Sequence, residues 1–179
     1  MGTSRERILD RVKATSVSSL HPGSGSASKF DSLDLWQSFE GFLNALGGRL
    51  ISRIELDGFL KKRCFVEPAA ADVLGISSVQ DDIWDVEVGI SFAELAIAET
   101  GTLIVTAGAG RSRMSSLAPP INIVLVSQKS IVATLAEAIP KIPTTTSVLI
   151  TGPSRTADIE GILVRGVHGP GELLVYVYE

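Results

Sequence analysis

The chain has little of what metal centres and disulfide frameworks require. Its 179 residues include one cysteine, Cys64, and two histidines, His21 and His168. A single cysteine excludes an intrachain disulfide and a cysteine-ligated iron–sulfur cluster within this chain, and two histidines exclude a multi-histidine zinc site. Cys64 lies in the strand-like run 63–66, so we interpret it as a buried structural thiol and not as a nucleophile. The sequence therefore predicts no metal site, and it identifies no cofactor.

The sequence also lacks features that mark membrane-spanning, exported and nucleic-acid-binding proteins. No apolar run approaches the ~20 residues that a membrane-spanning helix needs, and the first residues lack the apolar core of an export signal. The formal net charge is -4, which disfavours a nucleic-acid partner. Aromatic residues make up only 6% of the chain, so the core is predicted to be aliphatic. We therefore expect a cytoplasmic protein without a membrane span.

Apolar residues, by contrast, are plentiful and periodic, at 45% of the chain. Strand-like runs are found at 50–54, 64–66, 86–90, 121–126, 147–150 and 173–178. Helical patterns are found from Ser32 to about Leu46, from Asp57 to Lys62, near 69–74 and over 129–139, and a hairpin is expected around Thr100-Gly101. This alternation predicts an α/β fold with an open, mostly parallel sheet flanked by helices. The Ser/Gly-rich stretch 15–29 predicts a flexible N-terminal segment over 1–30, followed by a single domain over 31–179.

Two polar turns in the middle of the chain are candidate anion sites. The turn of Glu99, Thr100, Gly101 and Thr102 offers backbone N–H groups and hydroxyls, which suit a carboxylate or a phosphate. From the pattern alone, a simple hairpin turn with a solvated Glu99 is the stronger interpretation. Arg111 and Arg113 lie in a glycine-bearing loop, where two guanidinium groups could clamp a planar anion. An exposed basic loop is again the more ordinary alternative.

Polar residues between the last two apolar runs are the most informative feature. Gly152, Ser154, Arg155 and Thr156 follow a strand and are expected to enter a short helix, whose N-terminus would attract an anion. Ser154 or Thr156 could equally be a plain helix cap. His168 lies in a glycine-rich turn and is the side chain type that titrates near neutrality. We take His168 and Glu99 as candidate catalytic residues, with a structural role for His168 as the alternative.

Four segments together resemble the LUD-domain family: 96–103, 117–120, 151–160 and 166–172. The resemblance extends from about Val86 to Tyr178, and it marks the domain as LUD-type. It implies a fold like that of the NagB/RpiA/CoA-transferase group. It also implies a role in bacterial oxidation of L-lactate to pyruvate, beside iron–sulfur lactate-utilisation proteins as partners. Glu94 and Arg165 depart from the residues that relatives commonly show at these positions.

The sequence leaves two other functions open. One is a stand-alone enzyme on a CoA-transferase-like or sugar-phosphate-isomerase-like fold, acting on a small anionic substrate. The other is a non-catalytic scaffold that holds redox partners. Whether the chain is itself an enzyme is therefore not decided by its sequence.

Overall fold

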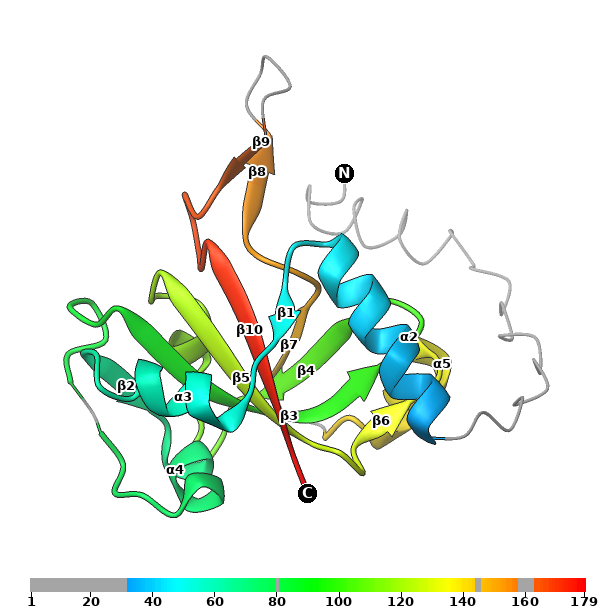
Figure 1. Ribbon diagram of the computed structural model, residues 1–179, viewed down its shortest axis with the longest axis horizontal. Helices are drawn as coiled ribbons and strands as arrows, with labels where there is room; N and C mark the ends of the chain where they lie inside the picture. The colour runs from blue at the N-terminus through cyan, green and yellow to red at the C-terminus, as the bar shows by residue number, and fades with distance from the viewer. Residues whose placement is uncertain (1–31, 80, 144–145, 158–162) are drawn as a thin grey trace, which may run out of the picture.

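An eight-stranded mixed sheet forms the centre of the molecule (Figure 1). The structure is a computed structural model that describes residues 32–79, 81–143, 146–157 and 163–179. The predicted flexible segment 1–30, with its Ser/Gly-rich stretch 15–29, lies outside the described residues. Strand order in the sheet is β1-β10-β5-β3-β4-β7, and the short strands β2 and β6 also pair with β3.

The sheet has a parallel half and an antiparallel half. The strands β1 (Arg49–Leu50), β10 (Glu172–Tyr178), β5 (Ile121–Ser127) and β3 (Val88–Ile97) run parallel, as do β2 (Cys64–Val66) and β6 (Ile131–Val132) beside β3. Beyond β3, β4 (Thr102–Thr106) and β7 (Ser147–Ile150) continue the sheet antiparallel. The predicted α/β fold with a mostly parallel sheet flanked by helices is confirmed.

Helices cover both faces of the sheet because its central strands are apolar on both sides. In β5, Val124 and Val126 pack with Phe39 and Leu43 of α2 (Ser32–Ala45). The alternate residues Ile123 and Leu125 belong to a second cluster on the opposite face, which includes Leu56 of α3 (Arg53–Phe59) and residues of α4 (Pro68–Leu74). These side chains are fully or almost fully buried, and burial of one such side chain contributes about 1.5–3 kcal/mol.

Two short strands form an arm outside the main sheet. Among the residues that the structure describes, β8 (Arg155–Ala157) and β9 (Leu163–Arg165) pair only with each other, antiparallel, and Figure 1 shows them projecting away from the sheet. The short helix expected after Thr151 is therefore wrong, because the chain enters β8 at Arg155. No helix N-terminus is available at this turn within the described residues.

Two other expected elements also differ. The helix expected over 129–139 is divided into β6, α5 (Leu135–Ala138) and η2 (Ile139–Lys141), because Ile131 and Val132 pair with the end of β3. The strand expected over 50–54 ends at Leu50, and α3 begins at Arg53, capped by Ser52. Asp57 lies inside this helix and does not cap it.

Candidate small-molecule site

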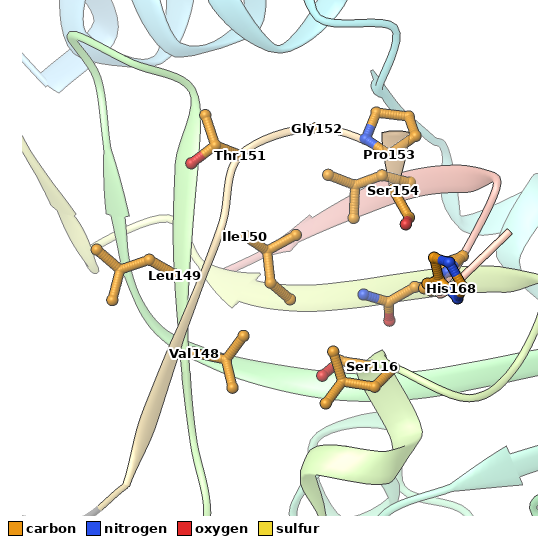
Figure 2. A pocket seen from close by; sticks show the side chains of 14 residues that line it. Ser116, Val148, Leu149, Ile150, Thr151, Gly152, Pro153, Ser154 and His168 are labelled. Atoms are coloured by element: carbon orange, nitrogen blue, oxygen red, sulfur yellow. The ribbon is translucent and has the colours of Figure 1, made fainter. Parts of the chain in front are cut away.

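A cavity of about 180 Å³ lies where the first residues of β5 and β10 meet the end of β7. Figure 2 shows Val148, Leu149 and Ile150 along one side of it, with Ser116, Ser154 and His168 along the other. Its remaining lining residues are Leu117, Asn122, Thr151, Gly152, Pro153, Gly169, Pro170 and Leu173. Drug-sized ligands occupy about 300–1,000 Å³, so this cavity suits a smaller molecule.

The most informative lining residue is Asn122, the second residue of β5. Its side chain is 1% exposed, and its Oδ1 accepts a hydrogen bond from Ser91 Oγ at 3.1 Å. Its Nδ2 has no hydrogen-bond partner among the residues that the structure describes. A buried donor without an acceptor costs about 1–3 kcal/mol. Because Asn122 is one of the residues that line the cavity, a ligand oxygen that reached Nδ2 would satisfy it.

Hydroxyl groups supply the cavity's other polar contacts. Ser116 is buried, and its hydroxyl donates to Arg113 O at 3.0 Å, which leaves its oxygen able to accept from a ligand. Ser154 is held by its backbone, since its N–H donates to Pro170 O at 2.8 Å and its carbonyl accepts from Gly166 N at 3.1 Å. These bonds fasten the 152–154 turn to the 166–170 turn and so fix the shape of the cavity.

His168 lies at the mouth of the cavity. It is exposed, and it also lines a wider groove of about 710 Å³ that includes Trp84, Pro120 and Val167. The described residues that line the smaller cavity include no Asp, Glu, Lys or Arg, and His168 supplies the one imidazole among them. The cavity therefore combines hydroxyl and amide groups inside with an imidazole at its entrance.

The Glu99–Thr102 turn lies elsewhere and is already occupied by internal contacts. Glu99 Oε1 accepts from Leu135 N at 2.8 Å, and the residue lines a different cavity between α2 and α5. The hydroxyls of Thr100 and Thr102 lie 2.8 Å apart, and Thr102 is equally close to Thr151 Oγ1. The structure thus joins the two predicted turns through Thr102 and Thr151, but it does not bring Glu99 and His168 into one cavity.

Two glycines of the predicted site serve close packing against α2. Gly101 has φ +62°, and a Cβ there would lie 2.7 Å from Leu43 N. Gly152 has φ +88°, and a Cβ there would lie 3.1 Å from Leu46 Cβ. Both positions require the left-handed backbone that glycine adopts without strain.

Arg111 belongs to a second polar cluster around Glu67. Its Nη1 donates to Thr106 Oγ1 at 2.8 Å and pairs with Glu94 Oε1, and its guanidinium lies 4.8 Å from the centroid of the Phe92 ring. Glu94 is the extra residue of β3 at the point where its register with β4 shifts. Arg111 is therefore neutralised within the chain, while Arg113 is exposed at the start of η1 (Arg113–Ser116).

Glu67 is completely buried beside this pair. Its carboxylate accepts from Phe92 N at 2.5 Å, Ser112 N at 3.2 Å and Ser115 Oγ at 3.1 Å. Burial raises the pKa of Glu67, although these hydrogen bonds and the nearby Arg111 act in the opposite direction. Glu67 thus holds the loop before η1 against β3.

The last two predicted residues lie on the arm and not in the cavity. Arg155 is exposed and Thr156 is half-buried, and neither lines the cavity that contains Ser154. Their role in binding a ligand stays a prediction, as do those of the other candidate residues.

Sequence reasoning missed Asn122 and Glu67. Asn122 is the only polar residue within the apolar run 121–126, and that interruption could have marked it. Glu67 gave a weaker signal, a glutamate directly before the proline that begins a helix.

Comparison with known families decides the relationship. The sequence profile described as LUD domain matches residues 55–178. The chain belongs to the LUD-domain family. The match includes β5, β7 and the 166–170 turn, and so it spans all the residues that line the cavity.

Curated relatives of this LUD-domain chain include proteins named for lactate utilization. Lactate utilization protein C of Macrococcus caseolyticus is 41% identical over 93 residues, which are 46% of this chain and 40% of that protein. Its counterpart in Bacillus subtilis is 41% identical over 92 residues, 46% of this chain and 38% of that protein. YkgG of Escherichia coli, described as uncharacterized, is 35% identical over 103 residues, which are 52% of this chain and 44% of that protein. The chain thus matches less than half the length of these relatives.

A solved structure supports the fold. A DUF162-family protein of Deinococcus radiodurans has a TM-score of 0.64 and 23% identity, covering 83% of this chain and 98% of that one. Within the described residues, no helix has the length and apolar character needed to cross a membrane. The same residues contain no group of three or more His, Cys, Asp or Glu side chains that could hold a metal ion.

Proposed function

We propose that this chain serves lactate utilisation by binding L-lactate, or its oxidation product pyruvate, in the Asn122 cavity. The observation that carries the proposal is the unpartnered Asn122 Nδ2, which needs an acceptor such as a carboxylate or keto oxygen. Ser116 and Ser154 offer hydroxyls to the rest of a small hydroxy or keto acid, and Val148 and Ile150 offer an apolar wall to its methyl group. The names of the relatives support the same substrate class.

In the complete reaction, we place the chain in a cytoplasmic iron–sulfur system that oxidises L-lactate to pyruvate. That oxidation releases an electron pair and two protons, and the electrons need an acceptor. The sequence has one cysteine, too few for a cysteine-ligated cluster, so the proposal assigns the clusters to partner proteins. His168 is the group at the cavity mouth that could exchange a proton with the bound acid. Glu99 lines a different cavity, so it has no part in this step.

Calorimetry on the Asn122→Leu variant tests the ligand. We expect wild type to bind pyruvate or L-lactate, and Asn122→Leu to bind about tenfold or more weakly, because a hydrogen bond to a charged group contributes about 1.5–3 kcal/mol. Ser91→Ala is the matched control, since Ser91 bonds the same amide but does not line the cavity. Equal affinities in wild type and Asn122→Leu would place the ligand elsewhere.

His168→Gln tests the residue at the entrance. Because the side chain is exposed, we expect the melting temperature to change little. Affinity for pyruvate should fall, since glutamine replaces the imidazole that lines the cavity mouth with an uncharged amide. A lower melting temperature with unchanged affinity would instead indicate a structural role.

Affinity purification of the native protein from lactate-grown cells tests the partners. Iron–sulfur proteins in the eluate would support the proposed system. Turnover of an acyl-CoA or a sugar phosphate by the purified chain alone would favour the stand-alone enzyme.

A further inference from the structure

Two arginines on the β8–β9 arm converge on one point of the body. Arg155 and Arg165 are directly opposite each other in the antiparallel pair. A Cβ added to Gly47 would lie 3.1 Å from Arg155 Nη2 and 3.1 Å from Arg165 Nη2. The two nitrogens are therefore no farther apart than the sum of these distances, 6.2 Å. Because Gly47 has no side chain, both guanidinium groups can lie close to its backbone.

Within the described part of the chain, neither guanidinium is neutralised by a carboxylate. The residues that the structure describes offer Arg155 and Arg165 no hydrogen-bond or ion-pair partner, whereas Arg49, Arg53 and Arg111 each pair with a carboxylate. Like charges directly opposite in a sheet destabilise it. The arm thus holds two cations together with an unused set of N–H donors.

The nearby end of α2 does not use those donors. Cations are favoured at a helix C-terminus, where carbonyl groups lack partners. In α2, however, the carbonyls of Phe42, Leu43 and Asn44 already accept from the backbone N–H groups of Leu46, Gly48 and Gly47 at 3.1, 2.9 and 2.9 Å. Helix capping therefore does not account for the arrangement.

We propose that Arg155 and Arg165, beside Gly47, form a binding site for a phosphate group. Two guanidinium groups carry a double positive charge, and a phosphate carries about -1.5 to -2 with several acceptor oxygens. Charge-assisted bonds of about 2.8 Å to different oxygens of one phosphate span the separation of the two nitrogens. A carboxylate carries a single charge, which one guanidinium fork already satisfies. The site goes beyond the lactate proposal, because neither arginine lines the Asn122 cavity.

Phosphate titration of the full-length protein at low ionic strength tests this site. Calorimetry with inorganic phosphate, against matched sodium chloride, should show binding to wild type. Arg155→Gln and Arg165→Gln should each weaken it about tenfold, because each removes one charged fork. Arg63→Gln, an exposed arginine on the loop before β2 that removes the same charge, should bind as wild type does.

Further variants distinguish the contribution of the planar guanidinium group from that of its positive charge alone. Arg155→Lys and Arg165→Lys keep the charge and lose the planar fork, so their affinity should fall below that of wild type while their melting temperatures stay close to it. A second titration with glycerol phosphate shows whether a phosphate ester binds more tightly than free phosphate. Absence of binding to wild type, or equal weakening by Arg63→Gln, would overturn the proposal and leave the Asn122 experiment unaffected.

Discussion

Two buried polar side chains, Asn122 and Glu67, interrupt the apolar interior in different ways. The Asn122 amide is half satisfied, because its Oδ1 has a donor and its Nδ2 has no partner among the described residues, and Asn122 is one of the residues that line the cavity. The Glu67 carboxylate has three donors and lines none of the cavities described above. An incomplete hydrogen-bond set in a cavity indicates a ligand, whereas a complete set indicates that the group organises the chain around it.

Glu67 gives a pH dependence with a definite sign. Its folded pKa is raised above the usual 4.5, so the folded protein binds this proton more tightly than the unfolded chain. Ionisation of Glu67 therefore reduces stability progressively as the pH rises from about 4.5 through the raised value. We expect the free energy of unfolding of wild type, minus that of Glu67→Gln, to fall over this range in urea titrations. A difference that rises with pH would contradict the assignment, and the exposed Glu87→Gln is the control.

At the scale of elements, the turn between β3 and β4 is fixed by its contact with α2. Gly101→Ala would add a Cβ 2.7 Å from Leu43 N at a position with φ +62°. We expect a loss of about 1–3 kcal/mol from backbone strain, with further loss from the clash. Gly41→Ala lies inside α2 with nothing within 4 Å and should stabilise by about 0.5–1 kcal/mol. Denaturant titrations of both variants give their free energies of unfolding. A Gly101→Ala variant as stable as Gly41→Ala would show that α2 can move away from the turn at no cost.

The elements also show what the sequence could predict. Strands 64–66 and 121–126 were recognisable because each is a compact apolar run, and α2 because its apolar residues repeat at helical spacing. The helix expected over 129–139 was wrong because pairing of Ile131 and Val132 with β3 overrides a helical pattern. Such pairing depends on residues distant in the chain, so no local pattern contains it.

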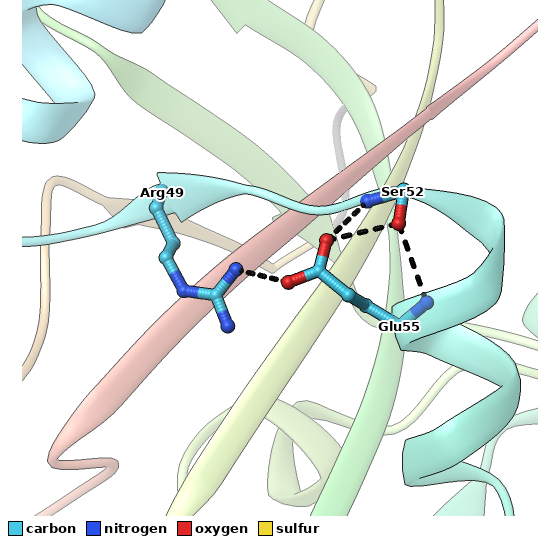
Figure 3. Close-up of polar contacts among 3 residues, drawn as sticks. All are labelled: Arg49, Ser52 and Glu55. Atoms are coloured by element: carbon cyan, nitrogen blue, oxygen red, sulfur yellow. Dashed lines mark hydrogen bonds and ion pairs between the residues drawn. The ribbon is translucent and has the colours of Figure 1, made fainter.

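The sequence contains a local signal for the start of α3. Ser52 and Glu55 form a capping box, which Figure 3 shows together with Arg49. Ser52 N donates to Glu55 Oε2 at 2.9 Å, and Arg49 Nη1 donates to Oε1 at 2.7 Å. These hydrogen bonds lower the pKa of Glu55 to about 2, and the bond from Ser52 N contributes more than the bond from Arg49. A serine followed three residues later by a glutamate predicts a helix start, which places α3 correctly.

The candidate site was less predictable than the fold. His168, Ser154 and Gly152 do line the cavity, since the chain brings two glycine-rich turns together. Arg155 was predicted at the same site because it follows the same strand and was expected to enter a helix, but the chain turns into β8 there and carries its side chain toward Gly47. Neighbours in sequence separate when a strand begins between them.

At the scale of the whole molecule, stability should be distributed unevenly. β3 pairs with four strands, β2, β4, β5 and β6, whereas β8 and β9 pair only with each other, and the described side chains of β9 are exposed. Native-state hydrogen exchange should therefore find the slowest amides in β3 and β5 and the fastest strand amides in β8 and β9. Equal protection of the arm and β5 would show that the arm packs against the body more firmly than its pairing suggests.

The position of β10 has a consequence for folding during synthesis on the ribosome. β10 follows the other described strands along the chain, yet it lies between β1 and β5, pairing Leu174 with Arg49 and with Ile123. Until residues 172–178 leave the exit tunnel, β1 lacks this strand as a partner and one edge of β5 is open. An unpaired strand edge invites association with other chains. The sheet is therefore completed only when β10 emerges, and a pause in translation just before residue 172 would prolong exposure of the β5 edge.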